Sequence, residues 1–298
     1  MSRTAHRLTP RQALQQPAIL VVALVLLAAA CTSSDIATHA PAANGDQLNG
    51  PRRTYFIAAD EVVWNYAPSG SNQLTGAPFD DTANTFVARG PGRIGSSYTK
   101  CLYRGYTDPG FQVATASDSY LGILGPVLHA VVGDRVDIVF RNRCSIPASI
   151  HMHGLRYDKA SEGAPYNDDT SGAAKADDSV APGQSYTYHY DVPERAGPGP
   201  MDPSSTMWMY HSHVDEIGDT YAGLMGPVVV TKRGMAKPDG SPKDVDRELF
   251  ELFSVMDENK SPYLEQNIKK FAEAGGDTVK WHGRIRTHGS RRCCTMST

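Results

Sequence analysis

Short apolar runs separated by turn-forming residues dominate the chain from about residue 52 onward. The runs with the clearest strand character are residues 55 to 66, 121 to 140 and 149 to 157. The second run is broken at Gly133-Asp134, after which apolar and polar residues alternate up to Phe140. This alternation after a Gly-Asp turn predicts a half-buried strand of a hairpin.

The same pattern continues through the next hundred residues. Tyr186, Tyr188 and Tyr190 follow a turn at Pro182-Gly183 and share one strand face at a spacing of two. A third strand group, residues 206 to 210 and 225 to 231, completes the pattern. Many short strands without a helix-length amphipathic period predict an all-β Greek-key β-sandwich over residues 52 to 233.

The C-terminal part differs from the sandwich. Residues 234 to 275 read as a linker, then a strand at 246 to 256 that begins a second domain, and a short helix within 263 to 273. Residues 276 to 298 show no strand or helix period. This irregular tail is interpreted as a frameshifted or truncated end, with a disordered native tail as the alternative.

The N-terminus has the pattern of a targeting segment. Three arginines precede an apolar run, residues 18 to 30, that ends in small residues before Cys31. Residues 1 to 31 are therefore predicted to be a signal peptide, followed by a flexible tether over residues 32 to 51. The run of 13 apolar residues is shorter than the roughly 20 that span a bilayer, so a permanent anchor is not expected.

Cys31 allows a second interpretation of this segment. Residues 27 to 31 resemble a bacterial lipoprotein box, in which the cysteine becomes the lipidated first residue of the mature protein. The alternative is plain cleavage beside an incidental cysteine. In both cases the protein is expected outside the cytoplasm, in the periplasm or at the cell surface, with lipid as its one membrane contact.

Charge and the remaining cysteines narrow the function classes. A formal net charge of -3 and the lack of a basic block give no reason to expect nucleic acid binding. Cys101 and Cys144 lie inside the predicted sandwich, where an oxidising compartment would favour a disulfide. Two separate buried thiols are the alternative, because sequence does not supply the geometry of a bridge.

Two His-x-His pairs carry the candidate chemistry. His151 and His153 form one pair and His211 and His213 the other, so together they hold four of the ten histidines. On a strand, residues two apart project from one face, and each pair therefore presents two imidazoles side by side. Imidazole nitrogen binds copper, zinc, iron and nickel, so the pairs predict a metal site without choosing the metal.

Further segments surround the pairs in a fixed order. They are residues 150 to 157, 162 to 164, 176 to 178, 182 to 188, 209 to 213 and 222 to 229. This series resembles the first cupredoxin domain of ceruloplasmin-like multicopper oxidases, the group that includes hephaestin. The resemblance covers residues 55 to 271 and implies a cupredoxin-like sandwich followed by the start of a second cupredoxin domain.

The resemblance also implies a reaction and a set of ligands. In this family oxygen is reduced to water at a three-copper site shared by the first and last cupredoxin domains, each of which supplies four histidines. By motif position His151 would bind the type 2 copper, and His153, His211 and His213 the type 3 pair. The implied partners are a C-terminal cupredoxin half, in the same chain or another subunit, molecular oxygen, and a reducing metal ion or phenol.

What the sequence lacks limits this expectation. A type 1 copper site needs a cysteine thiolate, but Ser212 stands where related domains have the cysteine. The chain is therefore not expected to be blue or to catalyse the reaction alone. Two other functions stay open: an exported copper-buffering protein, and a mononuclear enzyme of cupin type. The second would need a glutamate about four residues after His153, whereas Glu162 comes later.

Carboxylates cluster in the loop that follows the first histidine pair. The resemblance implies a calcium site in this loop, and hard oxygen ligands suit that ion. The residues expected to form it are Lys159, Glu162, Asp168, Asp177 and Asp178. A solvated acidic loop without an ion is the alternative.

Overall fold

The computed structural model of the chain describes residues 48–90, 92–116, 119–272 and 292–295. All of these residues belong to one compact unit, Gly45–Thr298. The predicted signal peptide, Cys31 and most of the tether lie outside the described residues.

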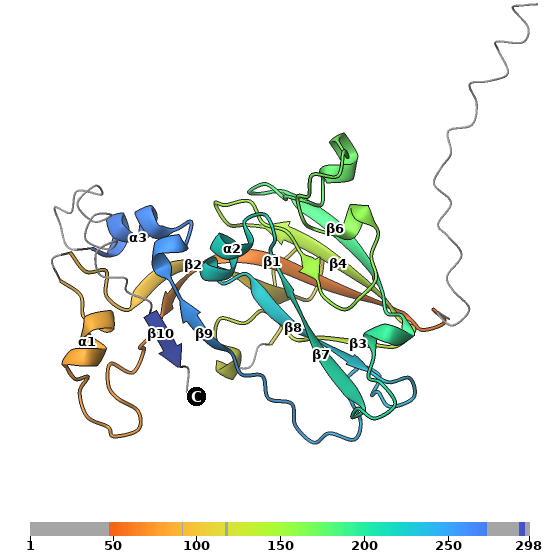
Figure 1. The fold of residues 1–298 in the computed structure, drawn as a ribbon, viewed down its shortest axis with the longest axis horizontal. Coiled ribbons are helices and arrows are strands. Elements are labelled where there is room, and N and C mark those ends of the chain that lie inside the picture. The colour runs from red at the N-terminus through yellow and green to blue at the C-terminus, as the bar shows by residue number, and fades with distance from the viewer. Residues whose placement is uncertain (1–47, 91, 117–118, 273–291, 296–298) are drawn as a thin grey trace, which may run out of the picture. The chain divides into compact units, whose positions relative to one another are not determined.

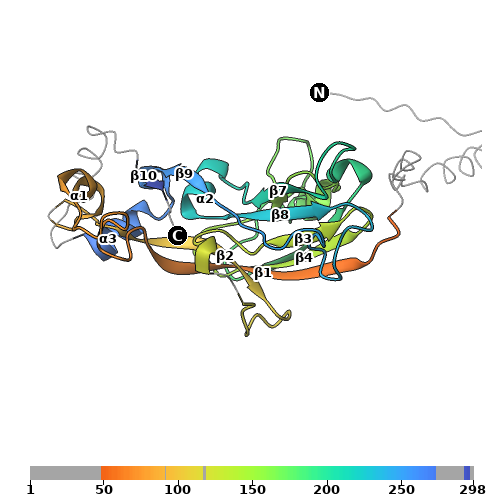
Figure 2. The same cartoon turned by 90° about the horizontal axis from the view of Figure 1, so that it is seen from below.

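Two four-stranded sheets form the sandwich, with the orders β2-β1-β4-β6 and β3-β8-β7-β5. Figure 2 shows them in two layers, with β1 and β2 in one and β7 and β8 in the other. The strands are β1 (Arg52–Asn65), β2 (Ser97–Tyr106), β3 (Leu128–Val131), β4 (Arg135–Asn142), β5 (His151–Met152), β6 (Ser185–Asp191), β7 (Ser205–His211) and β8 (Met225–Thr231). Neighbours are antiparallel except for the parallel pairs β1 with β4 and β3 with β8. The predicted all-β class is confirmed.

Alternating residues of these strands fill the core between the sheets. On β4, Val136, Ile138 and Phe140 are buried while the residues between them are not. On β6, the predicted tyrosine face turns inward, and Tyr188 and Tyr190 are fully buried against this core. Each large apolar side chain buried in this way stabilises the fold by about 1.5 to 3 kcal/mol.

The predicted hairpin around Gly133-Asp134 is wrong. The turn is present, with Gly133 at a φ of 98°, but β3 pairs with β8 and β4 pairs with β1 and β6, so the two strands belong to different sheets. The turn leads the chain from one layer to the other. A period of two arises in both arrangements because each strand has one buried face, and sequence alone therefore does not separate them.

Among the described residues, three short α-helices accompany the strands: α1 (Asp81–Val87), α2 (Glu216–Ala222) and α3 (Leu264–Phe271). Only α3, inside residues 263 to 273, was expected. α2 begins at Asp215, whose side chain accepts a hydrogen bond from the Gly218 N–H, and ends at Gly223 in the left-handed region. Seven residues are too few to show an amphipathic period. Across the described ranges, no helix is both long and apolar enough to cross a membrane.

The segment after the sandwich packs back onto it (Figure 1). Met256 of β9 (Phe253–Met256) packs with Leu102, and Ile268 of α3 packs with Tyr98. The buried Lys100 ammonium forms an ion pair with the Glu258 carboxylate. β9 pairs with β10 (Arg292–Thr295), a strand that was not expected inside the tail, whose other residues lie outside the described ranges.

A disulfide joins Cys101 of β2 to Cys144, two residues beyond β4. The two Cα atoms are 6.0 Å apart and both side chains are buried. The bridge closes a stretch of 43 residues, and it replaces the alternative of two separate thiols.

Candidate metal centre

The register of two strands brings the histidines together. His151 of β5 lies opposite His211 of β7, and the next pair is Met152 with Tyr210. Met152 and Tyr210 are buried in the core. Because successive side chains of a strand point to opposite faces, the histidines project from the outer face of the second sheet. The predicted strand ended before His211, whereas β7 includes it.

All four predicted ligands lie in one cluster. The candidate donor nitrogens of His151, His153 and His211 lie within 4.8 Å of one another. The Nε2 atoms of His153 and His211 approach to 2.9 Å. The ring centroid of His213 is 5.1 Å from that of His151 and 5.6 Å from that of His211.

Backbone carbonyls orient two of the rings. The Nδ1 atom of His151 is 2.6 Å from the Glu162 carbonyl oxygen, and the Nδ1 atom of His211 is 2.9 Å from the Ser212 carbonyl oxygen. A carbonyl accepts, so each Nδ1 carries the proton and each Nε2 keeps its lone pair free for a metal. These two oxygens had no signal in the sequence, because backbone atoms of any residue type can supply them.

Electrostatics favours neutral rings at this site. Burial lowers the pKa of His151 and also lowers the pKa of His211. Both rings are therefore neutral at pH 7, as a metal ligand must be. His153 is exposed to solvent, so one side of the cluster is open.

Ser212 does not face the cluster. Its fully buried hydroxyl donates to Asp219 Oδ2 at 2.5 Å and accepts from the Ser149 N–H at 3.0 Å. The Ser149 hydroxyl in turn accepts from the His213 N–H at 3.0 Å. Burial raises the pKa of Asp219 to about 6. This network of hydrogen bonds links the segments that carry the two histidine pairs, and no sequence motif had pointed to Ser149 or Asp219.

The acidic loop is arranged around a lysine. The Lys159 ammonium lies 3.0 Å from Glu162 Oε2, 3.1 Å from Asp168 Oδ2 and 3.1 Å from Asp178 Oδ1. Lys175 adds a second ammonium, 3.3 Å from Asp168 and 3.4 Å from Asp178. Four of the five residues expected to bind calcium therefore meet through the positive charge of Lys159.

Asp177 lies apart from that group. Its Oδ2 atom accepts the Gly163 N–H at 2.9 Å, while its buried Oδ1 atom has no hydrogen-bond partner among the described residues. Burial raises the pKa of this carboxyl group. The Ser149 hydroxyl donates to the Gly163 carbonyl at 2.6 Å, so the loop is fastened to the strand that carries His151.

The backbone carbonyl and the side-chain carboxylate of Glu162 have different partners. Its carbonyl orients His151, whereas its carboxylate pairs with Lys159. Because Lys159 holds the Glu162 carboxylate, this group does not supply the metal ligand that a cupin-type site requires. The histidines alone form the donor set that the structure describes here, and neutral imidazoles suit copper.

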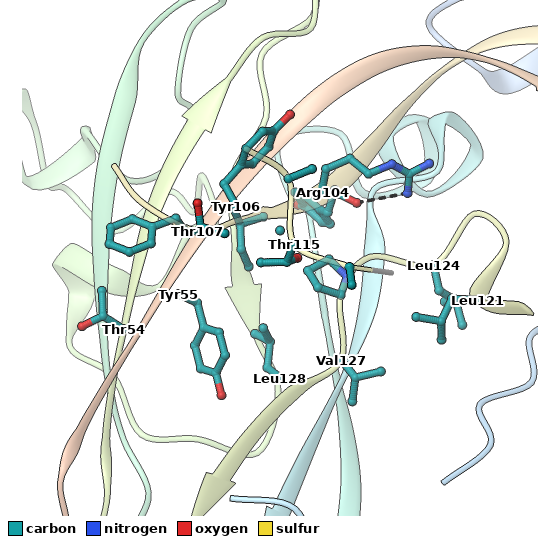
Figure 3. Close-up of a pocket in the computed structure, with 17 residues that line it drawn as sticks. Thr54, Tyr55, Arg104, Tyr106, Thr107, Thr115, Leu121, Leu124, Val127 and Leu128 are labelled. Atoms are coloured by element: carbon teal, nitrogen blue, oxygen red, sulfur yellow. Dashed lines mark hydrogen bonds between the residues drawn. The ribbon is translucent and has the colours of Figure 1, made fainter. Parts of the chain in front are cut away.

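A cavity of about 560 Å³ lies elsewhere, between β1, β2 and residues 121 to 128 (Figure 3). Its lining includes Arg104, whose side chain donates to the Tyr103 carbonyl at 3.4 Å. None of the four histidines lines this cavity. It is therefore separate from the candidate metal centre.

Known proteins resemble this chain over most of its length. Residues 112–234 match the multicopper oxidase family. Human ferroxidase HEPHL1 is 47% identical over 222 residues, which is 74% of this chain and 19% of that protein. Mouse hephaestin is 44% identical over 239 residues (79% and 21%), and rat ceruloplasmin is 40% identical over 240 residues (78% and 23%).

The solved structure of a multicopper oxidase named mgLAC superposes with a TM-score of 0.37 at 21% identity, covering 62% of this chain and 40% of that one. The chain spans about a fifth of the length of the curated relatives it matches. The matched region contains all four clustered histidines. The chain is a member of the multicopper oxidase family, related to hephaestin, HEPHL1 and ceruloplasmin.

Proposed function

We propose that this chain is the copper-binding N-terminal cupredoxin domain of an exported multicopper oxidase. It would supply half of the trinuclear copper site that reduces oxygen to water while a metal ion or phenol is oxidised. The observation that carries the proposal is the convergence of His153 and His211, whose Nε2 atoms are 2.9 Å apart on an open sheet face. In a member of a copper oxidase family, imidazole nitrogens placed this close together are best explained as copper ligands.

The cluster geometry supports a division of the ligands. The Nε2 atoms of His153 and His211 lie 2.9 Å apart, so these two residues would share one type 3 ion. His213 would bind the second type 3 ion, and His151, oriented by the Glu162 carbonyl, would bind the type 2 ion. Copper bound there supplies the redox chemistry, and the chain's own residues hold neutral imidazoles in fixed directions.

The open side of the cluster supports a shared site. His153 is exposed, and the histidines lie outside the sandwich core on the outer face of the second sheet. A C-terminal cupredoxin half, in the same polypeptide or in another subunit, would place its own four histidines against this face. Position 212 carries a hydroxyl group and not the cysteine thiolate that a type 1 copper site requires. Electrons would therefore enter through the C-terminal cupredoxin half.

Substrate and location are part of the same proposal. One relative is named a ferroxidase, which favours ferrous iron among the reducing metal ions. The signal peptide and the Cys31 lipid site would place the domain outside the cytoplasm, anchored to a bacterial membrane through lipid. Residues 234 to 275 would begin the second cupredoxin domain.

A calcium ion in the acidic loop is a further element. The buried Oδ1 of Asp177 supports it, because an oxygen ligand without a hydrogen bond among the described residues is available for a hard cation. Glu162, Asp168 and Asp178 would join it once the Lys159 ammonium moves out of their midst.

The test is copper stoichiometry and oxygen uptake on the purified chain. The wild type should bind copper, the His151→Ala/His153→Ala double variant should lose it, and His189→Ala on β6 should bind as the wild type does. Rapid four-electron oxygen reduction by the chain alone would contradict a half-site. Tight binding without any gain of activity after adding the C-terminal half would favour a copper-buffering protein instead.

A further inference from the structure

Methionines continue the row of histidines along the outer face of the second sheet. Met207, Met209 and His211 are spaced two apart on β7, so their side chains share one face. The His153 N–H donates to the Met209 carbonyl at 2.9 Å, one step beyond the pairing of Met152 with Tyr210. His153 therefore lies opposite Met209 on the same face as His211, and side chains directly opposite on neighbouring strands have Cβ atoms roughly 5 Å apart.

Exposure sets these two methionines apart from the core. Met207 is 62% exposed and Met209 is 42% exposed. A third methionine, Met225 of β8, lies opposite His211 and is buried. Three of the nine methionines in the chain thus share one face with the metal-binding histidines, and two of them are open to solvent.

Packing does not account for the exposed pair. Strand positions favour β-branched and aromatic residues, and an exposed position on an outer face gains nothing from a long apolar side chain. The thioether sulfur does add a property that leucine or valine lacks, because it is a soft ligand that prefers cuprous over cupric ions. A soft sulfur pair beside an exposed imidazole is a ligand set for Cu(I).

We propose that the Met207 and Met209 sulfur atoms, together with the imidazole of His153, bind a cuprous ion at the solvent-exposed end of this row. His153 also approaches His211, so an ion held by the thioethers lies one ligand exchange away from the histidine cluster. The site would act as an entry point through which the cluster is loaded. The inference rests on the proposed function for its purpose, while the two thioethers lie outside the four-histidine set.

The competing explanation is that another domain covers these methionines as a plain apolar surface. Leucine substitution separates the two, because leucine keeps the apolar area and removes the sulfur. The test variant is therefore Met207→Leu/Met209→Leu. Met235→Leu, outside the strands, is the matched control.

The experiment is an anaerobic Cu(I) titration against a chromophoric chelator, with X-ray absorption spectra at the copper edge. The wild type and Met235→Leu should show copper–sulfur scattering from the first equivalent. The double leucine variant should lose that scattering and bind Cu(I) about 10-fold more weakly, a change of about 1.4 kcal/mol. Its Cu(II) affinity should stay within about twofold of the wild type, because the four histidines are intact.

Three outcomes would overturn the proposal. They are a wild-type spectrum without sulfur, sulfur scattering that persists in the double variant, and an equal loss of Cu(I) and Cu(II) binding. The proposed function fails differently: Cu(II) binding would then be indifferent to His151→Ala/His153→Ala. Thermal melting of each variant checks that the leucines leave the fold intact.

Discussion

Two polar clusters meet at residues 159 to 163 and differ in how their charges are satisfied. In the acidic loop, Lys159 and Lys175 already stand between the carboxylates. In the histidine cluster, the Nε2 atoms of His153 and His211 face each other, and because the Nδ1 proton leaves His211 Nε2 as a lone-pair donor, the space between the two nitrogens takes either a proton on His153 Nε2 or a metal ion. In the first cluster a lysine ammonium already neutralises the carboxylates of Glu162, Asp168 and Asp178, although not that of Asp177, whereas the second is a set of nitrogen donors that a metal ion would join.

This difference favours the copper proposal over the calcium proposal. Copper binding requires no rearrangement of a counter-charge, while calcium binding requires Lys159 to leave three carboxylates. Both clusters nevertheless depend on one segment, because the Glu162 carbonyl orients His151 and the Glu162 carboxylate holds Lys159. Substitutions in and around this segment therefore test whether the clusters are separate or coupled.

The largest effect is expected from Gly163→Ala. Gly163 has a φ of +68°, and an added Cβ would lie 2.2 Å from the Ile150 carbonyl oxygen, so strands and loop must shift. We expect a loss of about 3 kcal/mol or more in the free energy of unfolding, together with weaker copper binding. Chemical denaturation measures the first and copper titration the second.

Gly172→Ala is the matched control. Gly172 lies in the same loop at a φ of +60°, and an added Cβ there would meet nothing within 4 Å. The substitution should cost about 1 kcal/mol and leave copper binding unchanged. Equal losses in the two variants would show that the contact with Ile150 does not couple loop and cluster.

Ser212→Ala comes next. The variant leaves Asp219 without its hydroxyl donor and the Ser149 N–H without its acceptor, both in buried surroundings. We expect a loss of about 2 kcal/mol in the free energy of unfolding. Thermal and chemical denaturation measure it, and Ser212→Cys should recover less than half of the loss. An unchanged midpoint would mean that this network does not hold the histidine frame.

Lys159→Met tests the acidic loop. Removal of the ammonium leaves Glu162 and Asp178 facing each other, which should cost about 1 to 2 kcal/mol after solvent screening is allowed for. Calcium should restore more of the melting temperature in this variant than in the wild type, because the vacated position suits a cation. Lys269→Met, on the exposed side of α3, should respond to calcium as the wild type does. Indifference of Lys159→Met to calcium would remove the calcium proposal.

The smallest effect concerns pH. Burial raises the pKa of Asp219 to about 6, so the native state holds a proton that the unfolded chain releases near pH 4. This group therefore makes the fold less stable as pH rises from about 4 to about 6. Asp219→Asn should lack that component, by about 1 kcal/mol, when unfolding free energies at pH 5.5 and 7 are compared with the wild type. Parallel pH curves would contradict it.

The sequence predicted which histidines lie together because their signal is local. His-x-His on a strand places two rings on one face whatever the rest of the fold does. The hydroxyl network and the Glu162 carbonyl were out of reach, because they depend on how residues 149, 163 and 212 meet in space. The lysine-centred arrangement of the acidic loop was likewise hidden, since a row of carboxylates does not show which cation sits among them.

The sequence predicted the fold class correctly, but it did not predict how the strands are paired and connected. Alternation identified β4 and β6, but β2 is buried along most of its length and lacks alternation, so it was missed. The Gly133-Asp134 turn joins two sheets instead of two paired strands, a difference that lies in the partners of β3 and β4. Pairing is a tertiary property, and local patterns constrain it weakly.

Anomalous X-ray diffraction at the copper edge, from crystals of the chain grown with copper, tests most directly whether the four histidines bind copper. We expect a peak within bonding distance of the Nε2 atoms of both His153 and His211, with His151 and His213 beside it. A peak at the acidic loop alone, or an empty histidine cluster in crystals that hold copper elsewhere, would contradict it.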